Sequence, residues 1–314
     1  MIRKSITLIK ALLKMPFAVY SSTQELQVLN TKLDDHKILM GELFATINRS
    51  RTEEIIKNIH LSEFKVFSQW GDDGIIQFLI DYLEIENQVF IEFGVENYKE
   101  ANTRFLLINN NWRGLVMDGS LNNMQQLQNE NIYWRYDIKA LPLFVTKENI
   151  NSIFENNGFS GQLGLLHIDI DGNDYWIWKE INSISPVIVI VEYNSVFGYQ
   201  NSWTVPYDND FYRTNYHYSN LYWGVSLLSL CDLAQEKGYC FIGSNSNGNN
   251  AYFVQKDKIK ELKPLSAAEG YVLSKYRESR DINGKLTYLT GTDRLKEIKG
   301  MEIFNTRTGK LEKI

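Results

Sequence analysis

Two apolar runs near the middle of the chain each end in an acidic side chain. They are residues 163–169 and 186–192. Runs of this length and composition are typical of strands buried in a parallel sheet. In an open α/β sheet, ligands bind at the carboxyl ends of the strands. Buried carboxylates are costly unless they are paired or bound to a metal. The polar residues at these two strand ends therefore form a candidate site, and they are Asp169, Asp171, Asn173, Glu192 and Asn194.

Strand-like and helix-like segments alternate from Phe64 onward, which predicts a doubly wound, mostly parallel α/β sheet of seven strands. The expected strands are 89–93, 114–118, 132–136, 163–169, 186–192, 239–243 and 251–255. Helices are expected near 100–110, 120–130, 146–157, 173–183 and 223–237. The turn-rich segment 244–250 joins the last two strands as an antiparallel hairpin. A parallel sheet that ends in such a hairpin is similar to the layout of class I methyltransferases.

Composition narrows the class of protein. The chain has 314 residues, of which 44% are hydrophobic and 13% aromatic, so it can bury a substantial core. Its net charge of -5 argues against nucleic acid as a partner, because that role needs a basic face. Cys231 and Cys240 are the only cysteines, which excludes a disulfide framework and a cysteine zinc site.

We expect three parts: a helical extension over 1–62, a catalytic domain over 63–260, and a C-terminal segment over 261–314 that packs on that domain. In the first 20 residues, a helix would place basic and apolar side chains on opposite sides. The basic ones are Arg3, Lys4, Lys10 and Lys14, and the apolar ones are Ile2, Ile6, Ile9, Leu12 and Leu13. Such a helix contacts either an anionic membrane surface or another part of the protein.

A heptad pattern follows in residues 23–50, formed by Leu26, Leu29, Leu33, His36, Met40, Leu43 and Ile47. Dimerisation through this segment, giving a homo-oligomer, and an intramolecular helical hairpin are the two interpretations. No apolar run in the sequence is long enough to span a bilayer. Lys10 and Lys14 interrupt the N-terminal apolar stretch and no small-residue cleavage site follows, so we expect a cytoplasmic protein, with contact at the inner membrane face as an open alternative.

The end of the first strand favours one kind of cofactor. Gly94 is the only glycine of a possible triplet, because Glu96 and Tyr98 occupy the later positions. A pyrophosphate at this turn would be repelled by Glu96, whereas S-adenosylmethionine has no phosphate and carries cationic groups. Asp118, at the end of the second strand, is a candidate for the ribose hydroxyls, and a helix N-cap is its alternative role. Asp137, after the third expected strand, is a candidate for the adenine amino group.

Together these residues resemble the FkbM-type S-adenosylmethionine-dependent methyltransferases. The resemblance covers about 64 to 256 and rests on Phe-Ser-Gln-Trp-Gly-Asp-Asp-Gly-Ile-Ile (67–76), Ile-Glu-Phe-Gly (91–94), Asn102-Thr103, Trp112-Arg113-Gly114, Ile-Asp-Ile-Asp-Gly-Asn-Asp-Tyr (168–175), Val-Glu-Tyr-Asn (191–194) and 247–251. It implies an O-methyltransferase that acts on sugars or natural products, and this branch looks like those found with surface-polysaccharide genes. By resemblance, the residues that line the donor site would be Gln69, Glu92, Gly94, Asn102, Asp118 and Asp169.

Methylation of a sugar hydroxyl needs either a general base or a divalent cation that lowers the pKa of the hydroxyl. Oxygen ligands suit Mg²⁺, and the acidic cluster resembles the metal site of catechol-type O-methyltransferases. The predicted ligands, which would also form the catalytic centre, are Asp169, Asp171, Glu192 and Asn194. The alternative is that Asn173 or Asp174 caps the next helix while Glu192 binds a substrate hydroxyl without metal. In that case His167 or His217 would be the base, although His167 lies in an apolar strand and is expected to be a core residue.

The aromatic loop from Ser195 to Trp223 is a candidate surface for a sugar acceptor, with a buried aromatic cluster as its alternative. Arg277 and Arg280 would either hold an anionic group of the acceptor or form salt bridges. Two other functions stay open. Asp169-Ile170-Asp171 could be the D-x-D of a glycosyltransferase that uses a nucleotide sugar, and the chain could be a non-catalytic assembly protein with a methyltransferase-like fold.

Overall fold

The structure is a computed structural model of the chain. It describes the backbone of residues 2–314 and the side chains of residues 25, 26 and 28–314. The expected faces of the helix over the first 20 residues therefore lie outside the described side chains.

A seven-stranded sheet forms the centre of the molecule, in the order β3-β2-β1-β4-β5-β8-β7. The strands are β1 (Val89–Phe93), β2 (Arg113–Asp118), β3 (Ile138–Pro142), β4 (Gly161–Ile168), β5 (Ile184–Glu192), β7 (Tyr239–Ser244) and β8 (Asn250–Gln255). The first five are parallel, and β8 runs antiparallel to β5 and β7. This order, with the hairpin at one edge, confirms the class I methyltransferase fold predicted from the sequence.

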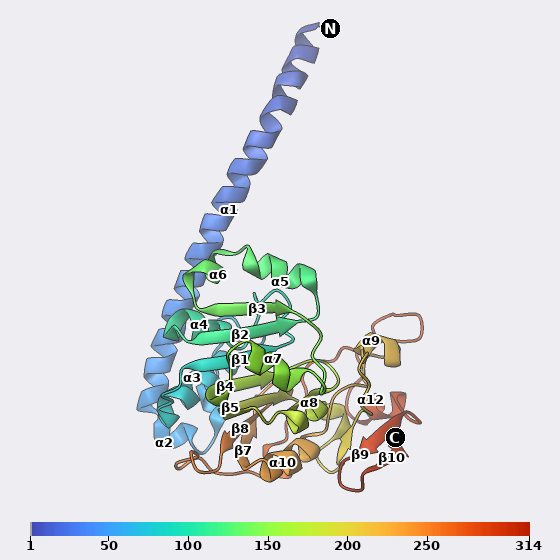
Figure 1. The fold of residues 1–314 in the computed structure, drawn as a ribbon. Helices are drawn as coiled ribbons and strands as arrows, with labels where there is room; N and C mark the ends of the chain where they lie inside the picture. Colours follow the sequence, from blue (N-terminus) through green and yellow to red (C-terminus); the bar gives the residue numbers. More distant parts are fainter. Residues whose placement is uncertain (1) are drawn as a thin grey trace.

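Helices cover both faces of this sheet (Figure 1). The alternating side chains of β1 explain why: Phe90 belongs to one buried core, while Ile91 and Phe93 belong to the other. The first core includes residues of α3 (Asp72–Leu83), α4 (Arg104–Asn110) and α5 (Leu121–Gln128). The second includes residues of α7 (Ile150–Asn156), α8 (Asp174–Glu180) and α10 (Leu227–Glu236).

The prediction for the third strand was wrong. Residues 132–136 lie in a short helix, α6 (Asn131–Arg135), and the strand itself is β3, Ile138–Pro142. Ile132 is buried, and Tyr133 and Tyr136 pack on the same core, which is the spacing of one helical turn rather than of a strand. This shift moves the residue at position 137 from the end of a strand to its beginning.

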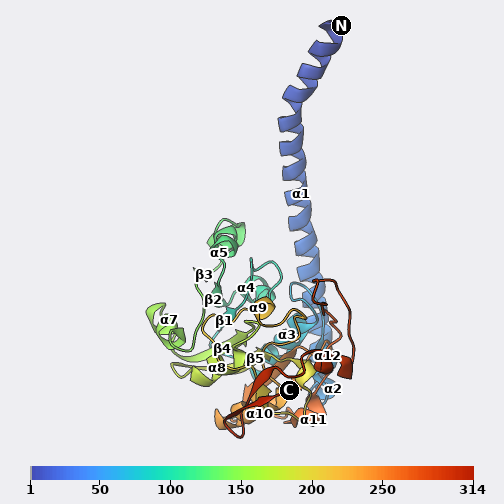
Figure 2. The same ribbon diagram turned by 90° about the vertical axis from the view of Figure 1, so that its right-hand side faces the viewer.

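The N-terminal helix α1 (Ile2–Ser50) is continuous and projects far from the sheet (Figures 1 and 2). Its C-terminal part packs on α3 and on η1 (Ile59–Ser62), and the short α2 (Thr52–Ile55) follows it. Because α1 is unbroken, the hairpin interpretation of residues 23–50 is wrong. Within the described residues, no helix combines the length and apolarity needed to cross a bilayer.

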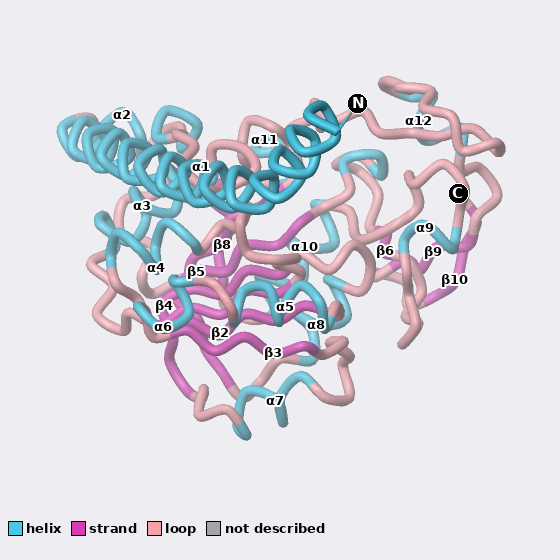
Figure 3. Tube along the Cα trace, turned by 90° about the horizontal axis from the view of Figure 1, so that it is seen from above, coloured by secondary structure: helices cyan, strands magenta, loops and turns pink. Residues whose placement is uncertain are grey.

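A small second sheet lies beyond the carboxyl ends of the parallel strands (Figures 1 and 3). It has the order β10-β9-β6 and joins the aromatic loop, through β6 (Trp203–Thr204), to β9 (Glu302–Asn305) and β10 (Lys310–Lys313) near the C-terminus. The remaining elements are η2 (Ser195–Phe197), α9 (Arg213–Tyr216), α11 (Ala267–Gly270) and α12 (Thr292–Glu297).

Candidate functional site

A row of polar residues crosses one face of the sheet at its carboxyl edge. Glu92 on β1 is the register partner of His167 on β4. Ile168 pairs with Val191, so the next residues along the two parallel strands, Asp169 and Glu192, are neighbours. Glu192 in turn pairs with Asn250 on β8. Register partners point to the same face, as do residues two apart on one strand, so these side chains form one continuous row.

Asp169 and Glu192 form a pair of adjacent carboxyl groups at the centre of this row. Burial, together with the charge of Asp171, raises the pKa of Asp169 to about 7. Burial and the charge of Asp169 raise the pKa of Glu192 well above its usual value. A side-chain hydrogen bond joins the two groups, and the second oxygen of Glu192, Oε2, is buried without a partner. Both residues are half-buried, and burial of the carboxyl groups together with the charge of Asp169 favours the protonated form of Glu192, which would donate this bond.

Arg213, from the aromatic loop, holds Asp171 in an ion pair with 2.9 Å between Nη1 and Oδ1. The guanidinium also donates to the carbonyl of Asn220, lies 3.6 Å from Glu278 and stacks over the ring of Trp223. Its charge lowers the pKa of Glu192 against the larger effect of burial, so Arg213 lies near the carboxyl pair. Sequence analysis missed Arg213, because its contacts join segments far apart in the chain.

Asn194 does not serve as the predicted metal ligand. Its amide nitrogen donates to the carbonyl oxygens of Leu221 and Trp223, each at 2.9 Å. Its amide oxygen accepts from the backbone N–H of Val196 and so begins η2. All of these partners are backbone groups, so Asn194 fixes the start of the aromatic loop.

The predicted set of four metal ligands is therefore not assembled. Asp171 is paired with Arg213 and Asn194 is bound to backbone, so Asp169 and Glu192 are the two members that meet. Among the residues with described side chains, no group of three or more His, Cys, Asp or Glu side chains is arranged to hold a metal ion. These residues do not fit the proposed Mg²⁺ centre.

Asp174 holds the loop between β4 and α8. Its carboxylate accepts the backbone N–H groups of Ile170 and Gly172, both at 3.0 Å. The interpretation of Asn173 or Asp174 as a side-chain cap of the next helix is wrong, because Asn173 stands at the N-cap position of α8 without a side-chain cap bond and Asp174 binds the preceding loop. Asn173 donates to the carbonyl of Asp208 in the aromatic loop, and its own buried oxygen has no partner. These bonds fix the backbone that carries Asp169 and Asp171.

Glu92 and Asn102, which the resemblance places at the donor site, belong to a buried network. The carboxylate of Glu92 accepts from the backbone N–H groups of Asn102 and Thr103, each at 3.0 Å, and from Nδ1 of His167 at 2.8 Å. Burial alone would raise the pKa of Glu92, but the bond to His167 and its charge outweigh it, and the pKa is lowered. His167 is thus a satisfied core residue, and Glu92 fixes the backbone between β1 and α4.

Asp118 connects the ends of β1 and β2. Its Oδ2 accepts the backbone N–H of Glu96 at 2.9 Å, and its Oδ1 accepts the N–H of Ser120 at 2.8 Å. Ser120 itself is the N-cap of α5, so the alternative role of Asp118 as that cap is wrong. Oδ1 also accepts from the side-chain amide of Asn123 at 3.3 Å. Asp118 is half-buried, and three of the roughly four acceptor positions of its carboxylate are thus used. It retains capacity for a ligand hydroxyl beside the exposed backbone of Gly94.

Asp137 does not reach this edge of the sheet. It precedes β3, and its carbonyl accepts the N–H of Gly114 at the beginning of β2. Its side chain is 73% exposed and lies 3.6 Å from Arg113. The predicted contact with adenine is therefore wrong, because Asp137 lies at the amino edge of the sheet, opposite Asp118.

Two other predicted residues, Gln69 and His217, form no hydrogen bond or ion pair with the carboxyl pair among the described side chains. Gln69 is exposed in the segment before α3, and its carbonyl accepts from Lys65. His217 hydrogen-bonds Ser219 and stacks on Tyr218. Burial lowers the pKa of His217, and Glu297 opposes that shift, so its electrostatic surroundings are those of the C-terminal segment.

A second group that sequence reasoning did not assign adjoins Glu192. Asp72, fully buried at the start of α3, accepts from the amide nitrogens of Asn245 and Asn250 and from the hydroxyl of Tyr252. Because its nitrogen is held by Asp72, Asn250 keeps a buried oxygen without a partner. Asp72 and Asn250 lie within segments quoted for the resemblance, but only the pairing of Asn250 with Glu192 shows that they reach the site.

The chain matches no family model and no curated protein. Among solved structures, it is similar to an S-adenosylmethionine-dependent methyltransferase from Clostridium acetobutylicum ATCC 824, with 9% identity over 67% of this chain and 99% of that one and a TM-score of 0.40. It is also similar to an O-methyltransferase from Bacillus cereus in complex with SAH, with 12% identity, 68% and 90% coverage and a TM-score of 0.40. The N-terminal domain of EvdMO1 with SAH bound has 9% identity, 60% and 80% coverage and a TM-score of 0.40.

Proposed function

We propose that this protein is an S-adenosylmethionine-dependent O-methyltransferase of the FkbM type. The observation that carries the proposal is the Asp169–Glu192 pair, two hydrogen-bonded carboxyl groups at adjacent strand ends in the same sheet edge as Asp118. A fold alone does not define an activity, whereas a titratable pair poised near neutral pH beside a ligand-binding edge supports proton-transfer chemistry.

The methyl donor fits the other half of this edge by its chemistry. Gly94 offers exposed backbone without a side chain, and Asp118 offers an acceptor position suited to ribose hydroxyls. Glu96 is exposed at the same turn, and its charge suits a cationic donor better than a pyrophosphate. When bound, the donor supplies an electrophilic methyl group.

Proton transfer is the task of the carboxyl pair. Asp169, when ionised, accepts the proton of the acceptor hydroxyl. Glu192, in its protonated form, donates a hydrogen bond that orients Asp169. Arg213 forms an ion pair with Asp171 and so holds that carboxylate in place beside the pair. This assignment replaces the predicted metal mechanism with a carboxylate base.

We further propose a sugar hydroxyl of a polysaccharide or glycan as the acceptor, in agreement with the family resemblance. Tyr199, Tyr212 and Tyr218 remain exposed in the aromatic loop, where their flat faces and polar tips suit a hydroxylated ring. Another EvdMO1 structure was obtained in the presence of SAH and D-fucose. We place the protein in the cytoplasm, with residues 1–20 at the inner membrane face.

Ligand-dependent thermal shift tests the donor class. We expect S-adenosylhomocysteine to raise the melting temperature, and we expect UDP-sugars, with or without Mg²⁺, to leave it unchanged. Asp118→Ala should weaken donor binding by about 1–3 kcal/mol in calorimetry, since ribose hydroxyls would lose a charged hydrogen-bond partner. Asp137→Ala is the matched control, because it removes the same group at the opposite edge of the sheet.

Stabilisation by a UDP-sugar and not by S-adenosylhomocysteine would replace the proposal with the glycosyltransferase alternative. Equal loss of donor affinity in both variants would remove Asp118 from the site. No response to any ligand would favour the assembly protein. EDTA belongs in the activity assay, because lost turnover there would restore the metal mechanism.

A further inference from the structure

Helix α1 is attached to its own domain through one narrow face. Ala45 and Asn48 are buried there, and Asn48 donates to the carbonyl of Ser62 at 2.8 Å. Gly41 lies so close to the domain that a Cβ at this position would be 2.8 Å from the side chain of Val66. This face needs no further partner, because the domain already covers it.

A second stripe on α1 is uncovered. We call it the heptad stripe, and its members are Leu26, Leu29, Leu33, His36, Met40, Leu43 and Ile47. Its six apolar side chains are between 41% and 61% exposed. At 100° per residue, the stripe points about 120° away from the attached face, so the domain leaves most of it uncovered. From Leu26 to Ile47 it extends for about 32 Å along the helix.

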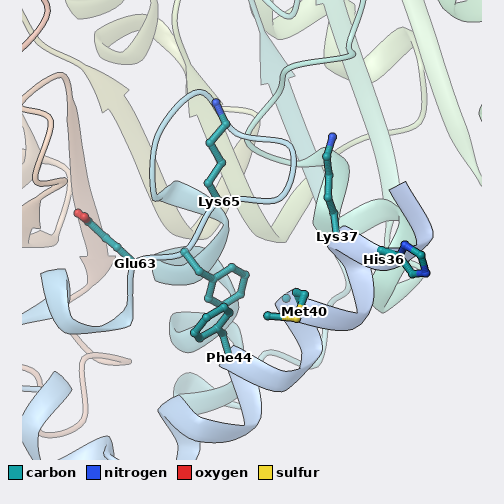
Figure 4. A pocket seen from close by; sticks show the side chains of 8 residues that line it. His36, Lys37, Met40, Phe44, Glu63 and Lys65 are labelled. Carbon is teal, nitrogen blue, oxygen red and sulfur yellow. The ribbon is translucent and has the colours of Figure 1, made fainter. Parts of the chain in front are cut away.

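The stripe widens where α1 meets the domain. Leu39 and Phe44 flank it there, and both are exposed. Phe44 stacks on Phe64 and lines a hollow of about 440 Å³ between α1 and the segment 63–65. Figure 4 shows Met40 and Phe44 together in this hollow, with charged side chains of Lys37, Glu63 and Lys65 around it. The stripe therefore continues into a hollow that can receive an apolar side chain.

Spacing and charge together identify the occupant. Alternating steps of three and four residues give the narrow seam of a coiled coil, whereas a membrane-surface helix needs a broad apolar face. Residues 25–50 hold four acidic and three basic side chains, so they have no net positive charge to attract an anionic membrane. A second copy of the chain presents the same stripe and satisfies the self-complementarity of a two-fold interface. We infer that two copies associate through their heptad stripes, with apolar side chains of each entering the hollow of the other.

The oligomeric state of the full chain tests this inference. We expect a dimer by sedimentation velocity and by light scattering at micromolar concentration. Leu29→Asp should raise the dimer dissociation constant by about 100-fold or more, because it places a charge in the seam. Val28→Asp is the matched control, since Val28 is 56% exposed, adjacent to Leu29 at 61%, and points away from the seam. His36→Leu should tighten the dimer, because it replaces the one polar member of the stripe.

A wild-type chain that stays monomeric at these concentrations would overturn the inference, as would equal weakening by Leu29→Asp and Val28→Asp. Far-ultraviolet circular dichroism of each variant ensures that helix loss is not mistaken for dissociation. A monomer that binds anionic vesicles, and loses that binding in Leu29→Asp, would assign the stripe to a membrane instead. None of these results depends on methyl transfer.

Discussion

Gly94 directly follows β1 and lies against the backbone of Asp169, which directly follows β4. Its φ is +69°, and a Cβ built there would lie 1.6 Å from the carbonyl oxygen of Asp169. The missing side chain therefore lets the backbone beside the proposed donor site lie against the backbone that carries Asp169. Resemblance and turn position identified Gly94 in the sequence, but not this contact.

Gly94→Ala should destabilise the protein by about 1–3 kcal/mol more than Gly158→Ala, because a side chain forced against backbone acts as overpacking. Gly158 also has a positive φ, +78°, but nothing lies within 4 Å of its added Cβ. Both substitutions share the cost of a left-handed conformation, so urea unfolding of the two variants isolates the contact with Asp169. Equal losses of stability would mean that the strand ends can separate without cost.

Titration of Asp169 gives a second expectation for a single residue. Its pKa is about 7, and only its ionised form can accept a proton, so kcat/KM should rise with pH and level off above about 7. Asp171 raises the pKa of Asp169, so Asp171→Asn should move this rise to lower pH. In this variant Arg213 would also lose its ion pair with Asp171, and its free positive charge would move the rise in kcat/KM to lower pH as well. An unchanged profile in Asp171→Asn, or one that falls with pH, would reject Asp169 as the base.

At the level of helices and strands, the sequence was most informative where a segment is buried on both faces. Strands β4 and β5 are long apolar runs inside the sheet, and neither has a competing helical pattern. Strand β3 is an edge strand of five residues, with buried positions at Ile138 and Ala140. The aromatic segment before it satisfied a strand pattern equally well and folded as α6. Asp137 was therefore predicted at the end of a strand, because the strand pattern of residues 132–136 was chosen over that of β3.

The site was partly predictable for a related reason. Strand order and register follow from the fold, and they bring Asp169 beside Glu192 once both strand ends are located. The sequence could not show which partners the loops provide for the other polar residues at these strand ends. Asn194 binds carbonyls of Leu221 and Trp223, and Asp171 binds Arg213, across loops whose conformations depend on tertiary packing. Two of the four expected ligands therefore hold loops in place instead of facing a metal site.

Across the whole molecule, the aromatic loop and the C-terminal segment form a shared core. Phe197, Phe211, Tyr222 and Trp223 are buried there with Ile298 and Ile303. Most of the loop thus follows the interpretation of a buried aromatic cluster. Arg280 likewise pairs with Glu278 at 3.0 Å, as its salt-bridge interpretation expected. The loop that carries Arg213 therefore depends on residues about a hundred positions later in the chain.

Ile303→Ala should reveal this dependence. Ile303 is fully buried, and its truncation should cost about 2–5 kcal/mol of stability, as should Ile55→Ala in the first core of the main sheet. Only Ile303→Ala removes support from the aromatic loop, so it should speed proteolytic cleavage within 195–223 and lower methyl transfer more than donor affinity. Ile55→Ala, matched in residue type and burial, should leave cleavage of that loop unchanged under native conditions. If both variants expose the loop equally, its order depends on global stability, and the C-terminal segment has no separate part in shaping the acceptor side of the site.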